Sequence, residues 1–253
     1  MVRGLDIWNE FFADHTDNYV LIGGTACNIH EEVFSQTPRA TKDLDIILVV
    51  EALSAEFGEK FWDFIRQGDY SSRQRGEEKH EYFRFMNPVN EAFPQQVELF
   101  SRNAGLLSRP EDMRIEPIHI EDGISSLSAI LMDEDYYNFT IKHSITYQGI
   151  HLANVEALIC LKGKAYTDLL TRKIAGEQVD SRNIEKHKKD IIRLAAMISR
   201  NDHFDLPDSI HKDMEQFCDE VASTLPNKDF LKSVGLTGID SEELLDTIRK
   251  AFL

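Results

Sequence analysis

The chain has 253 residues, of which 42% are hydrophobic, and its formal net charge is −16. Such a chain can bury a substantial core, and its negative charge excludes a protein that coats nucleic acid through a uniformly basic surface. It lacks a run of about 18 apolar residues, and acidic residues interrupt residues 1–18, so we expect neither a membrane span nor a signal peptide.

Residues 1–150 alternate between helix-like and strand-like segments. The predicted helices are Leu5–His15, Ala26–Phe34 and Ala52–Arg66, and the predicted strands are Tyr19–Ile22, Leu44–Val50, Tyr82–Met86 and Gln95–Phe100. Further strand-like pieces follow at Ile115–Ile120, Ser126–Ile130 and Asn138–His143. The polar segment 71–79 indicates a loop, and residues 87–94 indicate a turn between antiparallel strands.

Residues 151–253 have a helical pattern instead. The predicted helices are Val155–Thr171, Asn183–Arg200, Ser209–Ser223, Lys228–Val234 and Ser241–Ala251. No internal repeat or proline-rich linker separates the two parts, so we expect them to pack closely. The sequence therefore predicts an α/β (α+β) fold: a mixed sheet flanked by helices in residues 1–150, followed by a helical domain in residues 151–253.

Two aspartates, Asp43 and Asp45, begin the strand that leads to Val50. Side chains alternate along a strand, so both carboxylates project from the same face, roughly 7 Å apart. The residues after them are apolar on both faces, which is typical of a buried central strand. Carboxylates at the mouth of such a strand are costly to desolvate unless a cation or another partner compensates, and we expect the pair to bind a metal ion.

A turn of sequence Gly23-Gly24-Thr25 connects the first predicted strand to a helix. Glycine lets the main chain approach an anion closely, and the N–H groups at a helix N-terminus bind phosphate. The alternative is a tight turn that binds nothing. Together with Asp43 and Asp45, the turn predicts phosphate on one side and a metal ion on the other.

A third carboxylate is expected if two metal ions take part in phosphoryl transfer. Glu98 is the candidate, because the alternation of its short strand places Gln96, Glu98 and Phe100 on one face. The alternative is an exposed acid on a half-buried strand.

The segment 162–200 is basic, whereas the rest of the chain is acidic. It is either a solvated helical face or a surface that binds a polyanion, and Lys186, Lys189 and Arg193 would form one stripe of its second helix. Lys162 and Lys164 lie roughly 200° apart around their helix, so they cannot both face one site.

The three cysteines, Cys27, Cys160 and Cys218, fit neither zinc spacing nor a disulfide framework, which favours a reducing cytoplasm.

These motifs resemble the nucleotidyltransferase superfamily, and specifically the AbiEii-type abortive-infection toxins. In that family a Gly-Gly-Ser/Thr turn precedes an Arg-x-Thr-x-Asp-Leu-Asp strand start, and the segments 23–25 and 39–45 match both elements. A later lysine and a Lys/Arg-Asp pair are matched by Lys164 and by Lys189-Asp190. The resemblance covers residues 19–50 and, more loosely, residues 154–195. Many members have an aspartate where this chain has Glu98.

The resemblance implies an enzyme that transfers a nucleoside monophosphate from a nucleoside triphosphate (NTP) to an acceptor. Asp43, Asp45 and Glu98 would bind Mg²⁺ or Mn²⁺, and the turn Gly23, Gly24 and Thr25 would bind the phosphates. Lys164 would offset charge at the transferred phosphate. Lys189 would bind nucleotide, and Arg39 would either bind nucleotide or brace its loop.

The resemblance implies RNA, particularly the acceptor end of tRNA, or a protein side chain as acceptor. It also leaves open a role as the toxin of a toxin–antitoxin pair, with an antitoxin protein as partner. The alternatives are a small-molecule nucleotidyltransferase of the antibiotic-modifying kind and a nucleotide-binding pseudoenzyme. A purely structural α/β module would leave the two aspartates unexplained.

Overall fold

The computed structural model describes residues 2–77, 80–101, 116–117, 130 and 133–253, and these residues form two compact units. The first, which we call the sheet unit, comprises Met1–Asn28, Arg39–Met132 and Ser144–Ala153. The second, the helical unit, comprises Ile29–Pro38, Asp133–His143 and Asn154–Leu253. Two short segments before residue 150 thus belong to the helical unit, while the predicted two-domain division itself stays a prediction.

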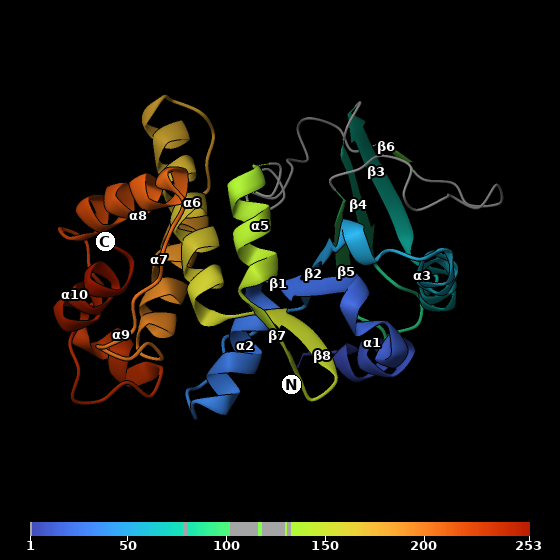
Figure 1. The fold of residues 1–253 in the computed structure, drawn as a ribbon, viewed down its shortest axis with the longest axis horizontal. Coiled ribbons are helices and arrows are strands. Elements are labelled where there is room, and N and C mark those ends of the chain that lie inside the picture. The colour runs from blue at the N-terminus through green and yellow to red at the C-terminus, as the bar shows by residue number, and fades with distance from the viewer. Residues whose placement is uncertain (1, 78–79, 102–115, 118–129, 131–132) are drawn as a thin grey trace. The chain divides into compact units, whose positions relative to one another are not determined.

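The described part of the sheet unit contains one mixed sheet of eight strands, in the order β6-β3-β4-β5-β2-β1-β8-β7 (Figure 1). The strands are β1 (Tyr19–Ile22), β2 (Asp43–Leu48), β3 (Ser71–Glu77), β4 (His80–Met86), β5 (Gln96–Ser101), β6 (Glu116–Pro117), β7 (Ser144–Tyr147) and β8 (Ile150–Ala153). Strand β2 lies antiparallel to β1 and parallel to β5. This confirms the predicted mixed sheet, with the strand of Glu98 beside that of the two aspartates.

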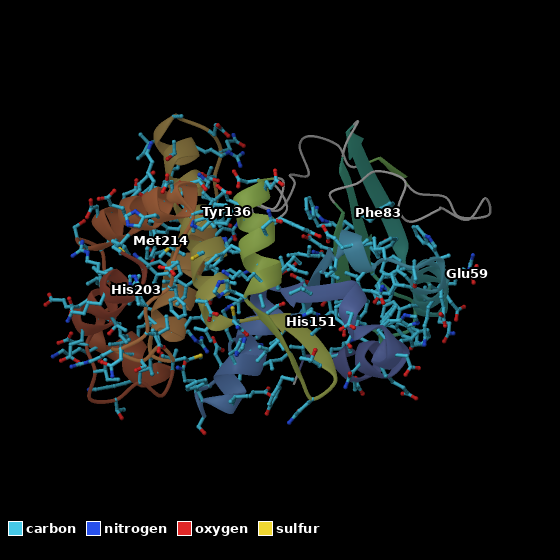
Figure 2. The ribbon with its side chains drawn as sticks, in the orientation of Figure 1. Glu59, Phe83, Tyr136, His151, His203 and Met214 are labelled. Atoms are coloured by element: carbon cyan, nitrogen blue, oxygen red, sulfur yellow. The ribbon has the colours of Figure 1, made fainter. Side chains whose placement is uncertain are left out.

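Aromatic side chains fill one face of this sheet. They come from α1 (Leu5–Phe11) and α3 (Ala55–Gly68). Helix α3 is capped by Ser54, whose hydroxyl accepts a hydrogen bond from the backbone N–H of Phe57. Trp62 contacts Phe83 of β4 edge to face, with ring centroids 5.8 Å apart (Figure 2). Because side chains alternate along a strand, Arg84, the residue after Phe83, projects from the opposite face. That opposite face carries Asp43, Asp45 and Glu98.

The helical unit is built from amphipathic helices around α6. Its helices are α5 (Glu134–Lys142), α6 (Val155–Ile174), α7 (Ser181–Ala195), α8 (Asp208–Val221), α9 (Lys228–Ser233) and α10 (Ser241–Phe252). Helix α6 approaches α8 closely at Gly163, where an added Cβ would lie 2.9 Å from the Met214 sulfur (Figure 2). Helix α2 (Gly23–Val33) starts in the sheet unit and ends in the helical unit. None of the described helices is long and apolar enough to cross a membrane.

Two predicted elements differ in the structure, and one hairpin was not predicted. Residues 138–143 were expected to be a strand but lie mostly in α5, whose first turn is capped by the Asp133 carboxylate. The predicted loop 71–79 is largely the strand β3, which pairs with β4 along its whole length. The β7–β8 hairpin was not predicted. The segment 126–129 and most of 115–120 lie outside the described residues.

Pairing with a neighbouring strand explains β3 and the hairpin. Strand propensity depends strongly on cross-strand and same-face neighbours, which are non-local. The local composition of residues 71–79 therefore predicts the wrong structure, because it contains no information about β4.

Candidate active site

The Gly-Gly turn packs directly against a predicted metal ligand. Strand β1 ends at Ile22, and Gly23 takes a left-handed φ of 69° as α2 begins. A Cβ at Gly23 would lie 1.8 Å from Oδ2 of Asp45, and one at Gly24 would lie 2.8 Å from the Thr41 hydroxyl. Glycine is therefore required at Gly23 by both its conformation and its distance from the carboxylate.

Strand register places the predicted acids on one face of the sheet. Asp45 is paired with Ile22 of β1 and with Glu98 of β5, and Asp43 is paired with Gln96. Paired residues on neighbouring strands project to the same side, and the strands lie about 4.8 Å apart. Asp43 and Glu98 are diagonal neighbours, with Cα atoms separated by roughly 8 Å. The register thus places the three acids of the metal hypothesis on one face of the sheet.

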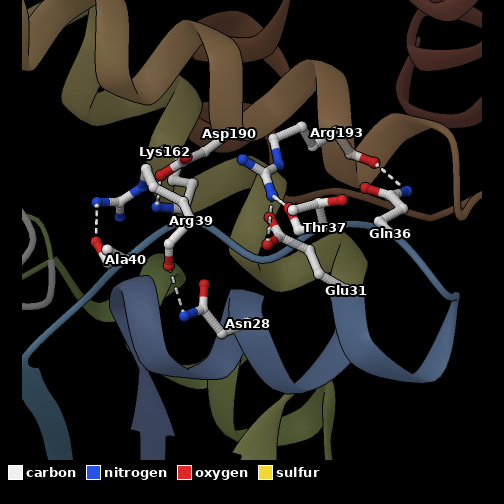
Figure 3. Close-up of polar contacts among 9 residues, drawn as sticks. All are labelled: Asn28, Glu31, Gln36, Thr37, Arg39, Ala40, Lys162, Asp190 and Arg193. Carbon is white, nitrogen blue, oxygen red and sulfur yellow. Dashed lines mark hydrogen bonds and ion pairs between the residues drawn. The ribbon is translucent and has the colours of Figure 1, made fainter. Parts of the chain in front are cut away.

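The loop that leads to these acids is braced from α2. Thr25 is fully buried, and its hydroxyl donates a 2.6 Å hydrogen bond to the backbone carbonyl of Asp43. Asn28 donates to the carbonyl of Arg39, and the Arg39 guanidinium donates to the carbonyl of Ala40 (Figure 3). The Thr25 hydroxyl and part of the Arg39 guanidinium therefore hold the loop. Phosphate binding at this turn would rely on its backbone N–H groups.

Glu98 is buried and is held by two donors. Its Oε1 accepts a 2.9 Å hydrogen bond from Arg84 Nε and a 2.9 Å hydrogen bond from Gln96 Nε2. Arg84 lies directly opposite Glu98 on β4. Among the described residues, no three His, Cys, Asp or Glu side chains form a group that could hold a metal ion. The set of Asp43, Asp45 and Glu98 therefore stays a prediction, with Glu98 already in an ion pair.

Sequence reasoning did not identify Arg84. The available signal was an arginine between two phenylalanines, which alternation places on the face opposite the aromatic core. That signal becomes informative only when the register with β5 is known.

In the helical unit, Lys164 is engaged by two carboxylates. Its Nζ lies 3.1 Å from Asp213 and 3.2 Å from Asp168. Burial lowers the pKa of Lys164, but the hydrogen bond to Asp213 and the charge of Asp168 outweigh this effect and raise its pKa above the usual value. Lys164 therefore forms an i,i+4 ion pair with Asp168, and its phosphate role stays a prediction.

Lys162 is buried in the same unit. It forms a 2.8 Å ion pair with Asp190 of α7, and both side chains are 2% exposed (Figure 3). Lys162 and Lys164 therefore point to different surroundings, as their angular separation requires.

The predicted basic stripe on α7 is wrong for Arg193. This residue is buried, donates a 2.7 Å hydrogen bond to Glu31 and a second bond to the carbonyl of Thr37 (Figure 3). The ammonium of Lys189 lies 5.2 Å from the ring centroid of Phe230, a cation–π arrangement. The helical pattern of α7 contains no information about the buried carboxylate of Glu31, which pairs with Arg193.

All three cysteines are free and buried. Burial raises the pKa of the Cys218 thiol to about 12 and also raises the pKa of Cys160. At neutral pH these two side chains are neutral thiols and are poor nucleophiles.

No protein-family model matches the chain, and no curated protein matches its sequence. The family resemblance therefore remains an expectation from the motifs alone.

Proposed function

We propose that the protein is a metal-dependent nucleotidyltransferase that moves a nucleoside monophosphate from an NTP to an acceptor. The observation that carries the proposal is the contact between the Gly23 backbone and the Asp45 carboxylate, with Asp43 on the same face of the sheet. A helix N-terminus attracts phosphate, and aspartates attract Mg²⁺. A metal–triphosphate complex needs a helix N-terminus for its phosphates and, next to it, carboxylates for its metal ion.

The donor set fits the cation. Mg²⁺ is usually bound through one or two carboxylates together with waters and substrate phosphates, rather than by a complete protein cage. Asp43 and Asp45 would supply these carboxylates, and Mn²⁺ accepts the same oxygen ligands. When bound, the ion would polarise the phosphoryl oxygens of the triphosphate.

The chain itself supplies orientation. The hydrogen bond from Thr25 to the Asp43 carbonyl fixes the first turn of α2 against the start of β2. Phosphate and carboxylates are thereby kept at a constant separation, which is how positioning lowers a barrier. The N-terminal end of α2 would also favour the negative charge of the phosphates.

The remaining predicted residues keep their proposed roles. Glu98 is the third acid of the face, and Arg39 and Lys189 would bind nucleotide. Lys164 would act at the transferred phosphate, for which it would have to exchange Asp168 and Asp213 for the substrate.

We propose RNA, in particular tRNA, or a protein side chain as the acceptor. An enzyme of this kind could act as a cytoplasmic toxin whose partner is an antitoxin protein. The buried free thiols support a reducing compartment. The burial of Arg193 favours a second candidate, a small-molecule acceptor, because it removes one cation from the stripe expected to bind a polyanion.

The test is incorporation of label from each of the four NTPs, with Mg²⁺ or Mn²⁺, into tRNA, protein or hydroxyl-bearing small molecules. Asp43→Asn and Asp45→Asn should each reduce transfer at least about 100-fold, which corresponds to about 2.7 kcal/mol. Glu59→Gln, on the exposed surface of α3, is the matched control and should have no effect.

Near-normal transfer by either aspartate variant would refute the catalytic assignment. Binding of NTP by the wild type without transfer to any acceptor would instead support the pseudoenzyme alternative. The acceptor that is labelled decides between RNA, protein and small molecule.

A further inference from the structure

We propose that the outer edge of β7 binds an extended, basic segment of a partner protein, which joins the sheet as a further strand. Strand β7 has the sequence Ser-Ile-Thr-Tyr and is the last strand of the described sheet, beyond β8 (Figure 1). The edge of a sheet presents backbone N–H and C=O groups, and the addition of a peptide strand to such an edge is a recurring mode of recognition. The surface lies within the sheet unit and is independent of the transfer activity.

The turn of the β7–β8 hairpin determines which backbone groups of β7 point outward. Tyr147 is paired with Ile150, which leaves a loop of two residues. Both loop residues, Gln148 and Gly149, have a positive φ, of 50° and 81°, as a type I′ turn requires. The residues that flank such a loop form a hydrogen-bonded pair, and the pairs alternate from there, so the N–H and C=O of Thr146 point away from β8. No hydrogen bond from another described residue reaches the Thr146 backbone.

Two apolar side chains of β7 extend the core beyond the last strand. Ile145 and Tyr147 project from the face on which their partners in the register, Leu152 and Ile150, are buried. Ile145 is nevertheless 44% exposed, and Tyr147 is 36% exposed. A further strand with apolar residues at alternate positions would cover both side chains and would remove their surface from water.

The opposite edge of the sheet has a different composition. Its last described strand, β6, consists of Glu116 and Pro117, and a charge and a proline are two of the features that prevent an edge from pairing. Strand β7 has neither a charged residue nor a proline, and its isoleucine, threonine and tyrosine favour strand structure. Because β7 has only four residues, the contact is small, and we expect reversible binding of modest affinity.

The N-terminal segment holds this hairpin in place. The side chain of Asn9, in α1, donates a 3.1 Å hydrogen bond to the backbone carbonyl of Gln148. His151 Nδ1 lies 2.9 Å from the carbonyl of Thr16 (Figure 2). The hairpin is therefore fixed beside α1 and the 3₁₀ helix Ala13–Asn18.

The charge of that N-terminal segment favours a basic occupant. Residues 4–28 contain neither lysine nor arginine, whereas Glu10, Asp14 and Asp17 are exposed close in the chain to the hairpin contacts. No ion pair within the described part of the chain engages these three acids. Lysine or arginine side chains of a partner would supply the complementary charge. A second copy of the chain would instead bring like charges together, and the net charge of −16 opposes that association.

The experiment uses the full chain and a fluorescent peptide of about ten residues in which valine and lysine alternate. Fluorescence anisotropy should show saturable binding of this peptide, and a peptide in which valine and glutamate alternate should bind at least about tenfold more weakly. Hydrogen exchange provides the second measurement. The N–H of Thr146 should exchange rapidly in the free chain and at least about tenfold more slowly with the valine–lysine peptide bound.

Variants of β7 test the backbone and the apolar surface of the edge. Thr146→Pro removes an outward N–H that makes no bond to β8, so the hairpin should be retained. Ile145→Lys places a charge on the same edge and keeps the proposal testable if the proline variant does not fold. Each should weaken peptide binding at least about tenfold. Val89→Lys adds the same charge at an apolar side chain that is 73% exposed outside the hairpin, and it should have less than about a twofold effect.

A second set of variants tests the charge. Asp14→Asn/Asp17→Asn should weaken binding of the valine–lysine peptide at least about threefold and make it less sensitive to salt. The control Glu59→Gln/Glu91→Gln removes the same charge from exposed positions elsewhere in the sheet unit and should have a smaller effect on both quantities.

Absence of saturable binding to the wild type would overturn the proposal. Undiminished binding to both Ile145→Lys and Thr146→Pro would also overturn it, because the peptide would then be held by the acidic surface alone. Unchanged exchange of the Thr146 N–H in the bound state would exclude strand addition at β7. A wild-type dimer that Ile145→Lys dissociates, detected by sedimentation, would assign the edge to a second copy of the chain instead of a basic partner.

Discussion

Replacing Gly23 with alanine tests the contact between the turn and the metal ligand. Gly23 has a φ of 69°, and an added Cβ would lie 1.8 Å from Oδ2 of Asp45. Nonbonded Cβ contacts below 3.0 Å are essentially never seen, so the carboxylate must move by at least 3.0 − 1.8 = 1.2 Å, or the turn must open.

Two separate costs follow from this geometry. The left-handed conformation costs a non-glycine residue about 1–2 kcal/mol. The displacement of Asp45 adds a cost at the site, because misplacement of a catalytic group by about 1 Å reduces activity on the order of 100-fold. Gly176 separates the two costs: it has a φ of 89°, and an added Cβ would meet no described atom within 4 Å.

The assay compares Gly23→Ala with Gly176→Ala by urea unfolding and by Mn²⁺ titration. Both variants should lose about 1–2 kcal/mol of stability from the backbone term, with any further loss confined to Gly23→Ala. Only Gly23→Ala should weaken Mn²⁺ binding and transfer, by an order of magnitude or more. Wild-type Mn²⁺ affinity in Gly23→Ala would show that Asp45 is not a ligand in the position that the turn defines.

Two predictions concern the helical unit. Arg193→Met should lower the free energy of unfolding by about 3–5 kcal/mol, because it removes the guanidinium that pairs with the fully buried Glu31. The double variant Glu31→Leu/Arg193→Met should recover much of this loss in urea unfolding, whereas a single variant within about 1 kcal/mol of wild type would contradict the argument. Burial raises the pKa of Cys218 from its ordinary value of 9.0 to about 12 in the folded chain. The unfolded chain therefore releases this proton first as pH rises, so stability should fall above about pH 9. Cys218→Ala should flatten the decline by up to about 1.4 kcal/mol per pH unit, and an unchanged slope in pH-dependent unfolding would refute this assignment.

The sequence predicted the elements whose pattern is local and periodic. Tyr19–Ile22 is apolar throughout and is followed by glycine, and the structure has that strand with the same ends. The C-terminal helices carry helical periodicity and capping residues, such as Asp240 before α10, and all of them are present. The spacing of Asp43 and Asp45 predicted that both side chains project from the same face of their strand, and this prediction did not require the neighbouring strands to be known.

Contacts between distant residues could not be predicted in the same way. Glu31 and Arg193 are separated by 162 positions, and each is charged, so each alone indicates an exposed surface. In the structure the two opposite charges are paired with each other in the interior. A pattern that considers one segment at a time assigns both to solvent, which is why the basic stripe was overestimated.

The Arg84–Glu98 pair is intermediate between local elements and contacts of distant residues, because a single turn sets the register that pairs the two residues. The backbone N–H of Asn87 donates to the carbonyl of Gln95, and pairing outward from this bond places Arg84 opposite Glu98. A slip of one residue would oppose Arg84 to Val97 and move the guanidinium away from the acidic face. Asn87 has a left-handed φ of 51°, a conformation that asparagine tolerates better than most residues, and it begins this turn. The Arg84–Glu98 ion pair therefore depends on a turn that the sequence does indicate, through a register that only the length of the turn defines.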